Sequence, residues 1–385
     1  MKILYISQWF SSSGGGGEVL FIEFASEMAK RGHSVHVLTH KDSSRAGLKF
    51  DNIYIHEVKP GLSSFPPSYF QNIGFILNAT WIGLRIIKNY QIDLIHCNNF
   101  SPIIVGTLLS KLCNKPLIKT VHVVFAATSK YWSNWSKQTN VSRFSSIIGP
   151  LFEKLTIRLP ADIIHTVSKT TKENLVRFGA RSKIILVPNI VNLSSYDKLN
   201  LKKSYGDYIL FIGRLVFNKN LNVLIESFVK VVQKVPNAKL IVVGTGPMLQ
   251  IWKKMVRDLE LKDRIIFTGY VGENEKMDLT ANTSAFVLPS INEGMPTVVL
   301  EAFAMSTPVI VSDIQSHREI VDDGVDGFLI PLDDKQKWAE KIIYILTNRE
   351  VCKKMGCNGR AKVEKQFSSQ IAINKLESIY KELIH

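Results

Sequence analysis

The chain has 385 residues, of which 45% are hydrophobic and 21% charged, and its formal net charge is +15. This length indicates two domains, and the composition excludes a disordered chain, a collagen and a coiled coil. No stretch of about 18 uncharged apolar residues occurs, so no membrane-spanning helix is expected. The first residues read as a strand and not as a signal peptide, and the four cysteines lack metal-site spacing. We therefore expect a cytoplasmic chain with reduced thiols.

Short apolar strands alternate with helical segments along the first half. Strands are predicted at residues 2–7, 34–39, 93–97, 116–121, 162–167 and 183–187, and a helix at 18–30 follows the first of them. A strand followed by a helix, repeated several times, predicts a parallel sheet with crossover helices.

A second series of strands follows a polar stretch at residues 189–206. Its strands are predicted at residues 208–212, 239–243, 265–268, 285–288, 308–311 and 327–330. The number of strands and the central break disfavour a single eight-stranded barrel. The pattern predicts an α/β protein with two doubly wound domains, at 1–190 and 191–368, and a site in the cleft between them.

The positive charge is concentrated in the first half. Residues 1–190 hold 22 Lys and Arg against 10 Asp and Glu, whereas residues 191–385 hold 26 against 23. Segments 61–69 and 125–157 mix aromatic residues with cations, which fits either a membrane interface or ordinary core packing. No nucleic-acid signature is present, so an anionic membrane surface is the expected partner. The candidate interface residues are Phe65, Tyr69, Trp132 and Trp135, with Lys130 and Lys137 beside them.

A run of four glycines, residues 14–17, lies between the first strand and the first helix. Backbone N–H groups at such a turn can approach an anion closely, and the helix N-terminus favours negative charge. The run matches neither the P-loop nor the dinucleotide fingerprint. A plain flexible turn fits it equally well.

Two cations follow the strand at 208–212. Arg214 and Lys219 come directly after its carboxyl end, next to Gly213. A guanidinium fork and an ammonium at a strand end are typical of a phosphate-binding arrangement.

Two carboxylates follow the strand at 285–288. Glu293 precedes a helix, and Glu301 is expected two turns inside it, among apolar neighbours. A loop carboxylate can accept hydrogen bonds from sugar hydroxyls, and the N–H groups at residues 294–298 are open to a polar ligand. Glu301 needs a buried partner, and a ribose diol would serve.

In these features the chain resembles the retaining glycosyltransferases of family 4. These enzymes have the GT-B fold, in which two Rossmann-like domains face each other across a cleft. The resemblance covers nearly the whole chain. It is carried by the pair Gly15-Gly16, by Arg214 with Lys219, by the E-x7-E motif of Glu293 and Glu301, and by His122 after a first-domain strand. Three departures concern Val123, Ser306 and Ser316-His317-Arg318, of which Ser306 stands where the family often has glycine.

The resemblance implies retaining, metal-independent transfer from a nucleotide diphosphate sugar, with UDP favoured and no cofactor. The acceptor would be a glycan or a lipid-linked glycan in cell-envelope polysaccharide or glycolipid synthesis, met at the inner face of the membrane. The catalytic residues would be His122, Arg214, Lys219 and Glu293. The donor-binding residues would be Gly15, Gly16, Asn189, Arg214, Lys219, Tyr270, Val271, Glu293, Gly294, Met295, Pro296, Thr297, Val298 and Glu301.

Each of these residues has an implied role. The pyrophosphate would lie on Arg214, Lys219 and the Gly15-Gly16 turn. The base would lie near Tyr270 and Val271, and the ribose on Glu301. Glu293 and the N–H groups after it would hold the donor sugar, which His122 would contact from the first domain. A final helix at residues 369–385 would pack back on the first domain, and the domains would close over the donor. Three alternatives remain: an inverting enzyme of the same fold, a sugar-nucleotide epimerase of the same fold, and a non-catalytic scaffold at the membrane.

Overall fold

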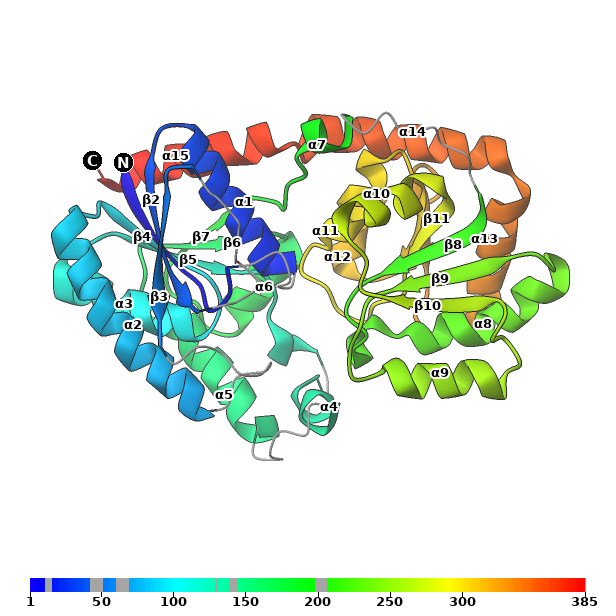
Figure 1. Ribbon diagram of the computed structural model, residues 1–385, viewed down its shortest axis with the longest axis horizontal. Coiled ribbons are helices and arrows are strands. Elements are labelled where there is room, and N and C mark those ends of the chain that lie inside the picture. Colours follow the sequence, from blue (N-terminus) through cyan, green and yellow to red (C-terminus); the bar gives the residue numbers. More distant parts are fainter. Residues whose placement is uncertain are drawn as a thin grey trace. The chain divides into compact units, whose positions relative to one another are not determined.

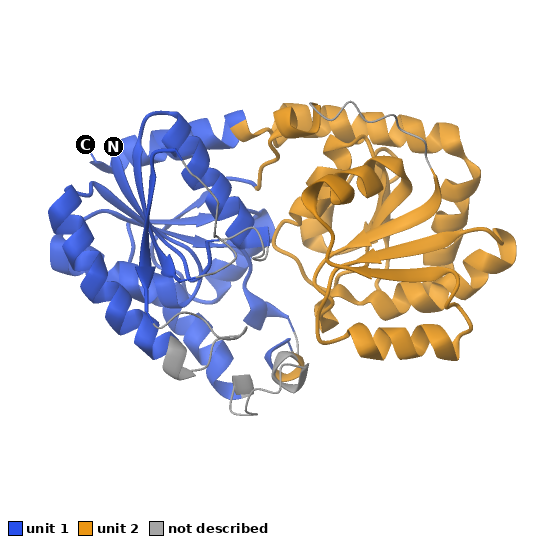
Figure 2. Ribbon diagram, viewed as in Figure 1, with its two compact units in different colours: residues 1–132, 143–188, 370–385 blue, residues 133–142, 189–369 orange. Residues whose placement is uncertain are grey.

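The computed structural model describes residues 1–10, 16–41, 51–59, 69–128, 131–138, 145–197 and 206–384. At 69–71, 135–138 and 145–146 only the backbone is described. The chain divides into two compact units (Figure 2). Unit 1 comprises residues 1–132, 143–188 and 370–385, and unit 2 comprises residues 133–142 and 189–369.

Unit 1 is built on a seven-stranded parallel sheet of order β3-β2-β1-β4-β5-β6-β7. Its strands are β1 (Lys2–Ile6), β2 (Ser34–His40), β3 (Ile53–Val58), β4 (Leu94–Cys97), β5 (Leu117–Val121), β6 (Ile163–Thr166) and β7 (Lys183–Leu186). The sequence did not predict β3, because His56 and Glu57 interrupt its apolar pattern. As an edge strand, β3 buries little more than Val58.

One face of this sheet carries an apolar core. Successive strand residues point to opposite faces, so Leu4, Ile6, Ile95 and Cys97 share one face. They pack with buried residues of four helices. These are α2 (Tyr69–Tyr90), α3 (Ser101–Cys113), α5 (Ser145–Arg158) and α6 (Lys169–Arg177).

The opposite face of the sheet carries α1 (Gly16–Lys30) and the C-terminal helix α15 (Ser369–Ile384) (Figure 1). Phe21 of α1 and Tyr380 of α15 both contact His96, which alternates with the core residues of β4. The remaining helical segments of unit 1 are η2 (Phe125–Ala127) and the start of α4 (Tyr131–Gln138).

A chain of buried hydrogen bonds crosses this second face. The hydroxyls of Tyr5 and Tyr380 are 2.8 Å apart, and the Tyr380 hydroxyl lies 2.5 Å from Nδ1 of His96. Nε2 of His96 lies 2.7 Å from Oγ1 of Thr120, which is 2.9 Å from Nδ1 of His165. Burial lowers the pKa of both imidazoles, that of His165 to about 4. The last helix is thereby bonded to the centre of the first sheet.

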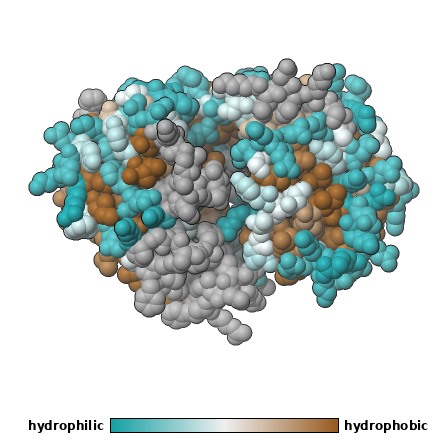
Figure 3. Space-filling model, viewed as in Figure 1, coloured by the Kyte–Doolittle hydropathy of each residue, from teal (hydrophilic) through white to brown (hydrophobic). Residues whose placement is uncertain are grey.

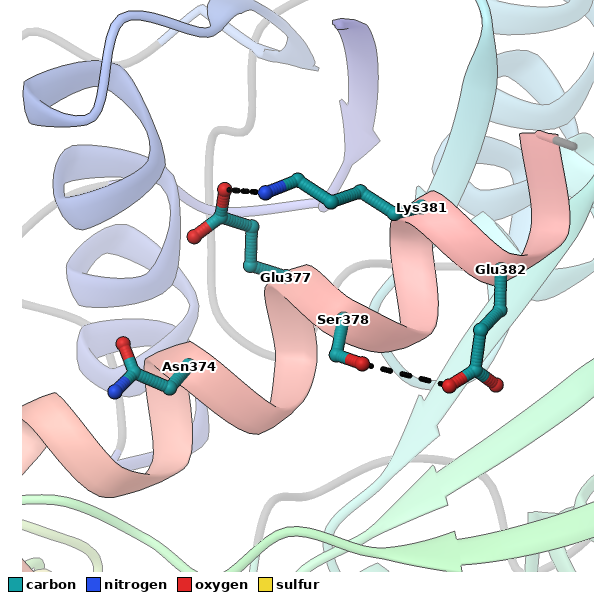
Figure 4. A pocket seen from close by; sticks show the side chains of 5 residues that line it. All are labelled: Asn374, Glu377, Ser378, Lys381 and Glu382. Atoms are coloured by element: carbon teal, nitrogen blue, oxygen red, sulfur yellow. Dashed lines mark hydrogen bonds and ion pairs between the residues drawn. The ribbon is translucent and has the colours of Figure 1, made fainter.

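Helix α15 also joins α1 through ion pairs. Glu377 lies 2.6 Å from Arg31 and 2.7 Å from Lys381. Hydrogen bonds from these two cations hold the pKa of Glu377 at about 2. A pocket beside Glu377 is lined, among the described residues, by Asn374, Glu377, Ser378, Lys381 and Glu382 of α15 (Figure 4). None of these residues belongs to the predicted site.

Unit 2 contains a six-stranded parallel sheet of order β10-β9-β8-β11-β12-β13. Its strands are β8 (Gly206–Ile212), β9 (Lys239–Val243), β10 (Ile265–Gly269), β11 (Thr283–Leu288), β12 (Val309–Ser312) and β13 (Gly327–Ile330). Its helical segments are α7 (Leu193–Asp197), η3 (Phe217–Lys219), α8 (Leu221–Lys234), α9 (Leu249–Asp258), α10 (Glu273–Asn282), α11 (Thr297–Ala304), α12 (Gln315–Arg318), α13 (Lys335–Thr347) and α14 (Arg349–Gln366). The predicted fold of two parallel α/β sheets is confirmed.

One departure from the family pattern, Ser306, lies where α14 packs closely on the backbone. Ser306, directly after α11, has a φ of 52°, in the left-handed region that favours glycine. A Cβ atom on Gly356 of α14 would lie 1.9 Å from the Ser306 carbonyl oxygen. The backbone therefore turns tightly here with serine in place of glycine.

No helix within the described ranges combines the length and the apolar character needed to cross a bilayer.

Candidate functional site

The loops after β8 and β9 lie against each other at the carboxyl edge of the second sheet. The amide of Leu215 donates to the carbonyl oxygen of Thr245 at 2.9 Å. Gly244 has a φ of 129°, and a Cβ atom there would lie 2.0 Å from the carbonyl oxygen of Gly213. Glycine at position 244 is therefore required for the two loops to meet. Arg214 lies exposed in the first of them.

An ion pair links the β8 loop to the β11 loop. The amide of Ile291 donates to the carbonyl oxygen of Asn218 at 2.8 Å, which brings the two loops together. Nζ of Lys219, the last residue of η3, then lies 2.5 Å from Oε1 of Glu293. Both side chains are mostly buried, at 16% and 14% exposed, so water screens the pair little.

The surroundings of Glu293 keep it ionised. Burial alone would raise the pKa of its carboxyl, but Lys219 and the Ser290 hydroxyl lower it below its usual range. His317 of α12 is fully buried beside this group, and burial lowers the pKa of its imidazole to about 4. Its Nδ1 lies 2.7 Å from the carbonyl oxygen of Ser312, and its Nε2 has no partner among the described residues. His317 is therefore neutral near pH 7.

A second carboxylate–lysine contact joins α11 to α10, the helix that follows β10. Oε2 of Glu301 is 3.3 Å from Nζ of Lys276, which also pairs with Glu273 at 2.8 Å. Burial opposes the charge of Lys276, but Glu301 and Glu273 together raise its pKa. Glu301 is the fifth residue of α11, little more than one turn inside it and not two. The helix begins only at Thr297, because Pro296 is held in an extended conformation.

The sequence reasoning missed Lys276. A signal was present, because Lys276 follows Glu273 by three residues in the first turn of a helix that begins after the end of β10. Its pairing with Glu301, which belongs to another helix, depends on the fold.

The loop that leads into α11 is anchored by Asn189. The side-chain Nδ2 of Asn189 donates to the carbonyl oxygen of Met295 at 2.5 Å, and Asn189 and Met295 are both buried. The Oδ1 atom of Asn189 has no partner in the described part of the chain. Gly294 and Pro296 are also buried. In the described part of the chain the N-cap residue Pro296 makes no side-chain hydrogen bond to α11, so the N–H groups of Thr297 and Val298 are candidates to bind a ligand. Thr297 and Val298 are half-buried there.

Residues predicted near the base follow β10. Tyr270 is 69% exposed, whereas Val271 is buried. The ring of Tyr270 is therefore available to a flat ligand, while Val271 fixes the turn that carries it.

Unit 1 places the predicted residue His122 against the start of α1, next to the predicted Gly16, at the end of its own sheet. Helix α1 begins at Gly16, and a Cβ atom on Gly17 would lie 2.8 Å from Cδ2 of His122. Nε2 of His122 lies 2.9 Å from Oδ1 of Asn98, and Nδ1 is buried without a partner in the described ranges. Burial lowers the pKa of His122 to about 3, so this imidazole is neutral. Gly15 lies outside the described residues.

The aromatic residues that follow β5 form an ordered cluster. The rings of Phe125 and Tyr131 are stacked at 4.5 Å, and the Trp132 indole donates to Glu153 at 3.1 Å. Glu153 is buried and also accepts the amide of Phe125. Trp132, an expected membrane residue, is therefore bonded within unit 1. Of the other expected interface residues, Phe65 and Lys130 lie outside the described residues, and so do the side chains of Tyr69, Trp135 and Lys137.

Two family models match the chain in succession. The model for "Glycosyltransferase Family 4" matches residues 14–195. The model for "Glycosyl transferases group 1" matches residues 196–362.

The chain is similar over most of its length to several curated proteins. It is 26% identical to N-acetyl-alpha-D-glucosaminyl L-malate synthase of Bacillus anthracis, covering 100% of this chain and 98% of the relative. It is 30% identical to an uncharacterized glycosyltransferase of Methanocaldococcus jannaschii, covering 100% and 99%. It is 27% identical to UDP-Gal:alpha-D-GlcNAc-diphosphoundecaprenol alpha-1,3-galactosyltransferase of Escherichia coli, covering 83% and 84%.

Solved structures share the fold. Sucrose-phosphate synthase from Thermosynechococcus elongatus superposes with a TM-score of 0.82 at 21% identity, covering 99% of this chain and 98% of that one. HepE of Anabaena, solved in complex with UDP-glucose, gives a TM-score of 0.79 at 18% identity, covering 100% of both chains. At these identities the likeness shows the two-domain GT-B fold.

Proposed function

The chain belongs to the glycosyltransferases, as its 30% identity over 99% of the Methanocaldococcus jannaschii relative shows. We propose that its unit 2 binds a nucleotide diphosphate sugar, with UDP favoured. The sugar is transferred with retention at its anomeric carbon to a glycan or lipid-linked acceptor. The contact between Lys219 and Glu293 carries this proposal, because it places a cation at the carboxyl edge of a parallel sheet, where such folds bind ligands.

Lys219 and Arg214 bind the pyrophosphate. An ammonium has three N–H donors, and Glu293 accepts from one of them, which orients the group. Its other donors, with the guanidinium of Arg214, offer charge-assisted hydrogen bonds to phosphate oxygens. Glu293 and the open N–H groups at the start of α11 then hold the hydroxyls of the donor sugar.

Glu301 binds the ribose. Its carboxylate can accept two hydroxyl hydrogen bonds, and the contact with Lys276 orients it. The exposed ring of Tyr270, with the backbone at Val271, follows β10, as Lys276 does, and contacts the base.

Transfer needs no protein nucleophile in this arrangement. The acceptor hydroxyl attacks the anomeric carbon on the face that the nucleotide leaves, so one C–O bond forms as another breaks. The departing phosphate takes the hydroxyl proton, and Arg214 and Lys219 stabilise its growing charge, the role a metal would otherwise have. His122 of unit 1, neutral and with an unpaired Nδ1 in the described part of the chain, contacts the donor sugar.

The names of the relatives support the choice of donor and acceptor. The Escherichia coli relative is named for UDP-galactose and for an acceptor linked to diphosphoundecaprenol. HepE was solved with UDP-glucose. By analogy, this chain uses a UDP-sugar and works on cell-envelope glycans at the inner, cytoplasmic face of an anionic membrane.

A thermal-shift screen against nucleotide diphosphates and their sugars tests the donor site, because a ligand that binds the folded state raises the unfolding temperature. UDP and a UDP-sugar should raise it in the wild type. Lys219→Ala and Arg214→Ala should weaken donor binding by about 2–5 kcal/mol. Lys354→Ala, on an exposed turn of α14, is the matched control and should bind as the wild type does.

Three outcomes would contradict the proposal. Near-normal donor affinity in both Lys219→Ala and Arg214→Ala would contradict the assignment of the phosphate site to these two residues. Conversion of the nucleotide sugar alone into its epimer would indicate an epimerase, and the absence of any nucleotide binding would indicate a scaffold. The anomeric configuration of a transferred sugar, measured by NMR, separates retention from inversion.

A further inference from the structure

Two helices of unit 1 present apolar stripes to the outside. On α2, Ile73, Leu77 and Trp81 follow at intervals of four residues and are 55%, 66% and 55% exposed. On α5, Ile147, Leu151 and Leu155 repeat the same spacing and are also exposed. Side chains four residues apart lie on one face of a helix, so each stripe is continuous.

The stripes lie on the same side of unit 1. Helix α3 packs between α2 and α5, and all three bury their inner faces in the same core. Leu108 and Leu112 of α3 are exposed as well. We call the outer surface of these three helices the α2–α3–α5 surface. In Figure 3, hydrophobic atoms lie over the part of unit 1 that α2 occupies in Figure 1.

The charged groups on this surface are all cations. Helices α2 and α3 contain no Asp or Glu, and the single acidic residue of α5, Glu153, is buried and hydrogen-bonded to main-chain amides. The exposed cations of the three helices are Arg85, Lys88, Lys111, Lys154 and Arg158. Among their described residues, these helices thus expose apolar and cationic side chains but no carboxylate.

We propose that the α2–α3–α5 surface binds the surface of a bilayer that contains anionic lipid. Leucine and isoleucine side chains enter the acyl boundary, while the long cationic side chains extend to the phosphates. Trp81 lies where these layers meet, with the guanidinium of Arg85 3.5 Å from its ring centroid. Tryptophan and arginine are suited to this depth of a membrane.

Charge argues for a bilayer and against a second copy of the chain. A symmetric dimer places the same patch on both partners, so Arg85, Lys154 and Arg158 would meet the same cations of the other copy. In a bilayer, anionic headgroups neutralise these cations, and the acyl region below the headgroups takes up the apolar side chains. A bilayer therefore satisfies both components of the surface.

This surface differs from the one expected from the sequence, which included Trp132. Binding through this surface would bring the proposed transferase to the membrane. The link between membrane binding and a lipid-bound acceptor rests on the proposed function. The two can fail separately, because vesicle binding is measured without nucleotide and UDP binding without vesicles.

The test is sedimentation of the full chain with vesicles of phosphatidylcholine and of an equimolar mixture with phosphatidylglycerol. Binding should be stronger to the anionic vesicles and should fall with salt. The double variant Leu77→Gln/Leu151→Gln should weaken it by at least about tenfold, because two inserted side chains are lost. Ile251→Gln, which replaces an equally exposed residue of unit 2, is the matched control and should bind as the wild type does. All variants should keep the UDP-induced thermal shift.

A second measurement does not depend on loss of binding. Brominated lipids should quench tryptophan fluorescence in the wild type, and Trp81→Phe should remove part of this quenching while binding persists. Equal binding by the double variant and the wild type would overturn the proposal, and so would indifference to anionic lipid at low salt. Sedimentation showing a dimer that the double variant abolishes would assign the surface to self-association instead.

Discussion

Gly17 lies directly against His122: a Cβ atom on Gly17 would approach Cδ2 of the imidazole to 2.8 Å and Nε2 to 3.0 Å. The glycine belongs to the first turn of α1, and the histidine follows β5. The same Nε2 is hydrogen-bonded to Oδ1 of Asn98, at 2.9 Å, which holds the imidazole in place. The ring therefore cannot accept a methyl group at position 17 without moving.

We expect Gly17→Ala to displace His122 and to lower the rate of sugar transfer by about 10–100-fold, because catalytic geometry tolerates little displacement. The global fold should persist. Gly74→Ala on α2 is the matched control, since nothing lies within 4 Å of its added Cβ. Unchanged turnover in Gly17→Ala would show that the position of His122 does not matter for transfer.

The two carboxylates of unit 2 should behave differently toward free nucleotide. Glu293→Ala releases Lys219 from its ion pair, so affinity for bare UDP should stay equal or rise while turnover of the UDP-sugar falls. Glu301→Ala removes the ribose acceptor and should weaken bare UDP by about 1–3 kcal/mol. Calorimetric titration with UDP and with a UDP-sugar measures both effects.

Glu275→Ala, on the exposed side of α10, is the control for these carboxylate variants and should match the wild type. If Glu293→Ala and Glu301→Ala changed UDP affinity equally, the division of roles between sugar and ribose would be wrong.

Unit 1 should lose stability in mild acid. Burial lowers the pKa of His96, His122 and His165 far below 6.5, the ordinary value that they regain on unfolding. Between pH 6.5 and about 4 the unfolded chain therefore binds more protons than the folded one, so the free energy of unfolding falls as the pH falls. At pH 5 each of these buried imidazoles should lower the free energy of unfolding by about 2 kcal/mol relative to neutral pH.

Hydrogen exchange followed by mass spectrometry at pH 7 and pH 5, corrected for intrinsic rates, resolves the two units. Unit 2 contains a single histidine, His317, so its strands should lose less protection than those of unit 1. Equal loss of protection in both sheets would contradict the prediction.

Tyr380 should contribute strongly to the stability of unit 1. Its hydroxyl contacts Tyr5 and His96 in a buried site, and Tyr380→Phe leaves both groups short of a hydrogen bond. We expect a loss of about 2–3 kcal/mol in denaturant unfolding. Tyr344→Phe on α13, a half-exposed tyrosine of unit 2, should change stability by less than about 0.5 kcal/mol. If Tyr380→Phe left the free energy of unfolding unchanged, water would have to satisfy the hydrogen bonds of Tyr5 and His96.

The parallel sheets could be predicted from the sequence because buried strands are written as uninterrupted apolar runs. The strands predicted at 239–243 and 327–330 have the same first and last residues in the structure. The edge strand β3 escaped notice, because a strand with one exposed side carries Tyr54, His56 and Glu57. Local pattern thus finds strands whose side chains are mostly buried, including the edge strand β13, and misses an edge strand that carries polar, exposed side chains.

Contacts between distant residues could not be predicted in the same way. Resemblance grouped Lys219 with Glu293, but the sequence gives no sign that the two form an ion pair. Lys276 and Glu301 lie on different helices, and only the fold brings them within 3.3 Å. The hydroxyls of Tyr5 and Tyr380 are 375 positions apart in the chain. Pairings of this kind follow from topology, which local periodicity does not encode.

The position of α15 has a consequence for biosynthesis. Residues 370–385 belong to unit 1, yet a ribosome makes them after the whole of unit 2. During translation the face of the first sheet that carries Tyr5 and His96 therefore lacks α15 while some 180 further residues are made, whereas both segments of unit 2 have been made by residue 369. Although unit 1 leaves the ribosome first, it is the last to be completed, and during that delay it is the part of the nascent chain that a chaperone would have to protect.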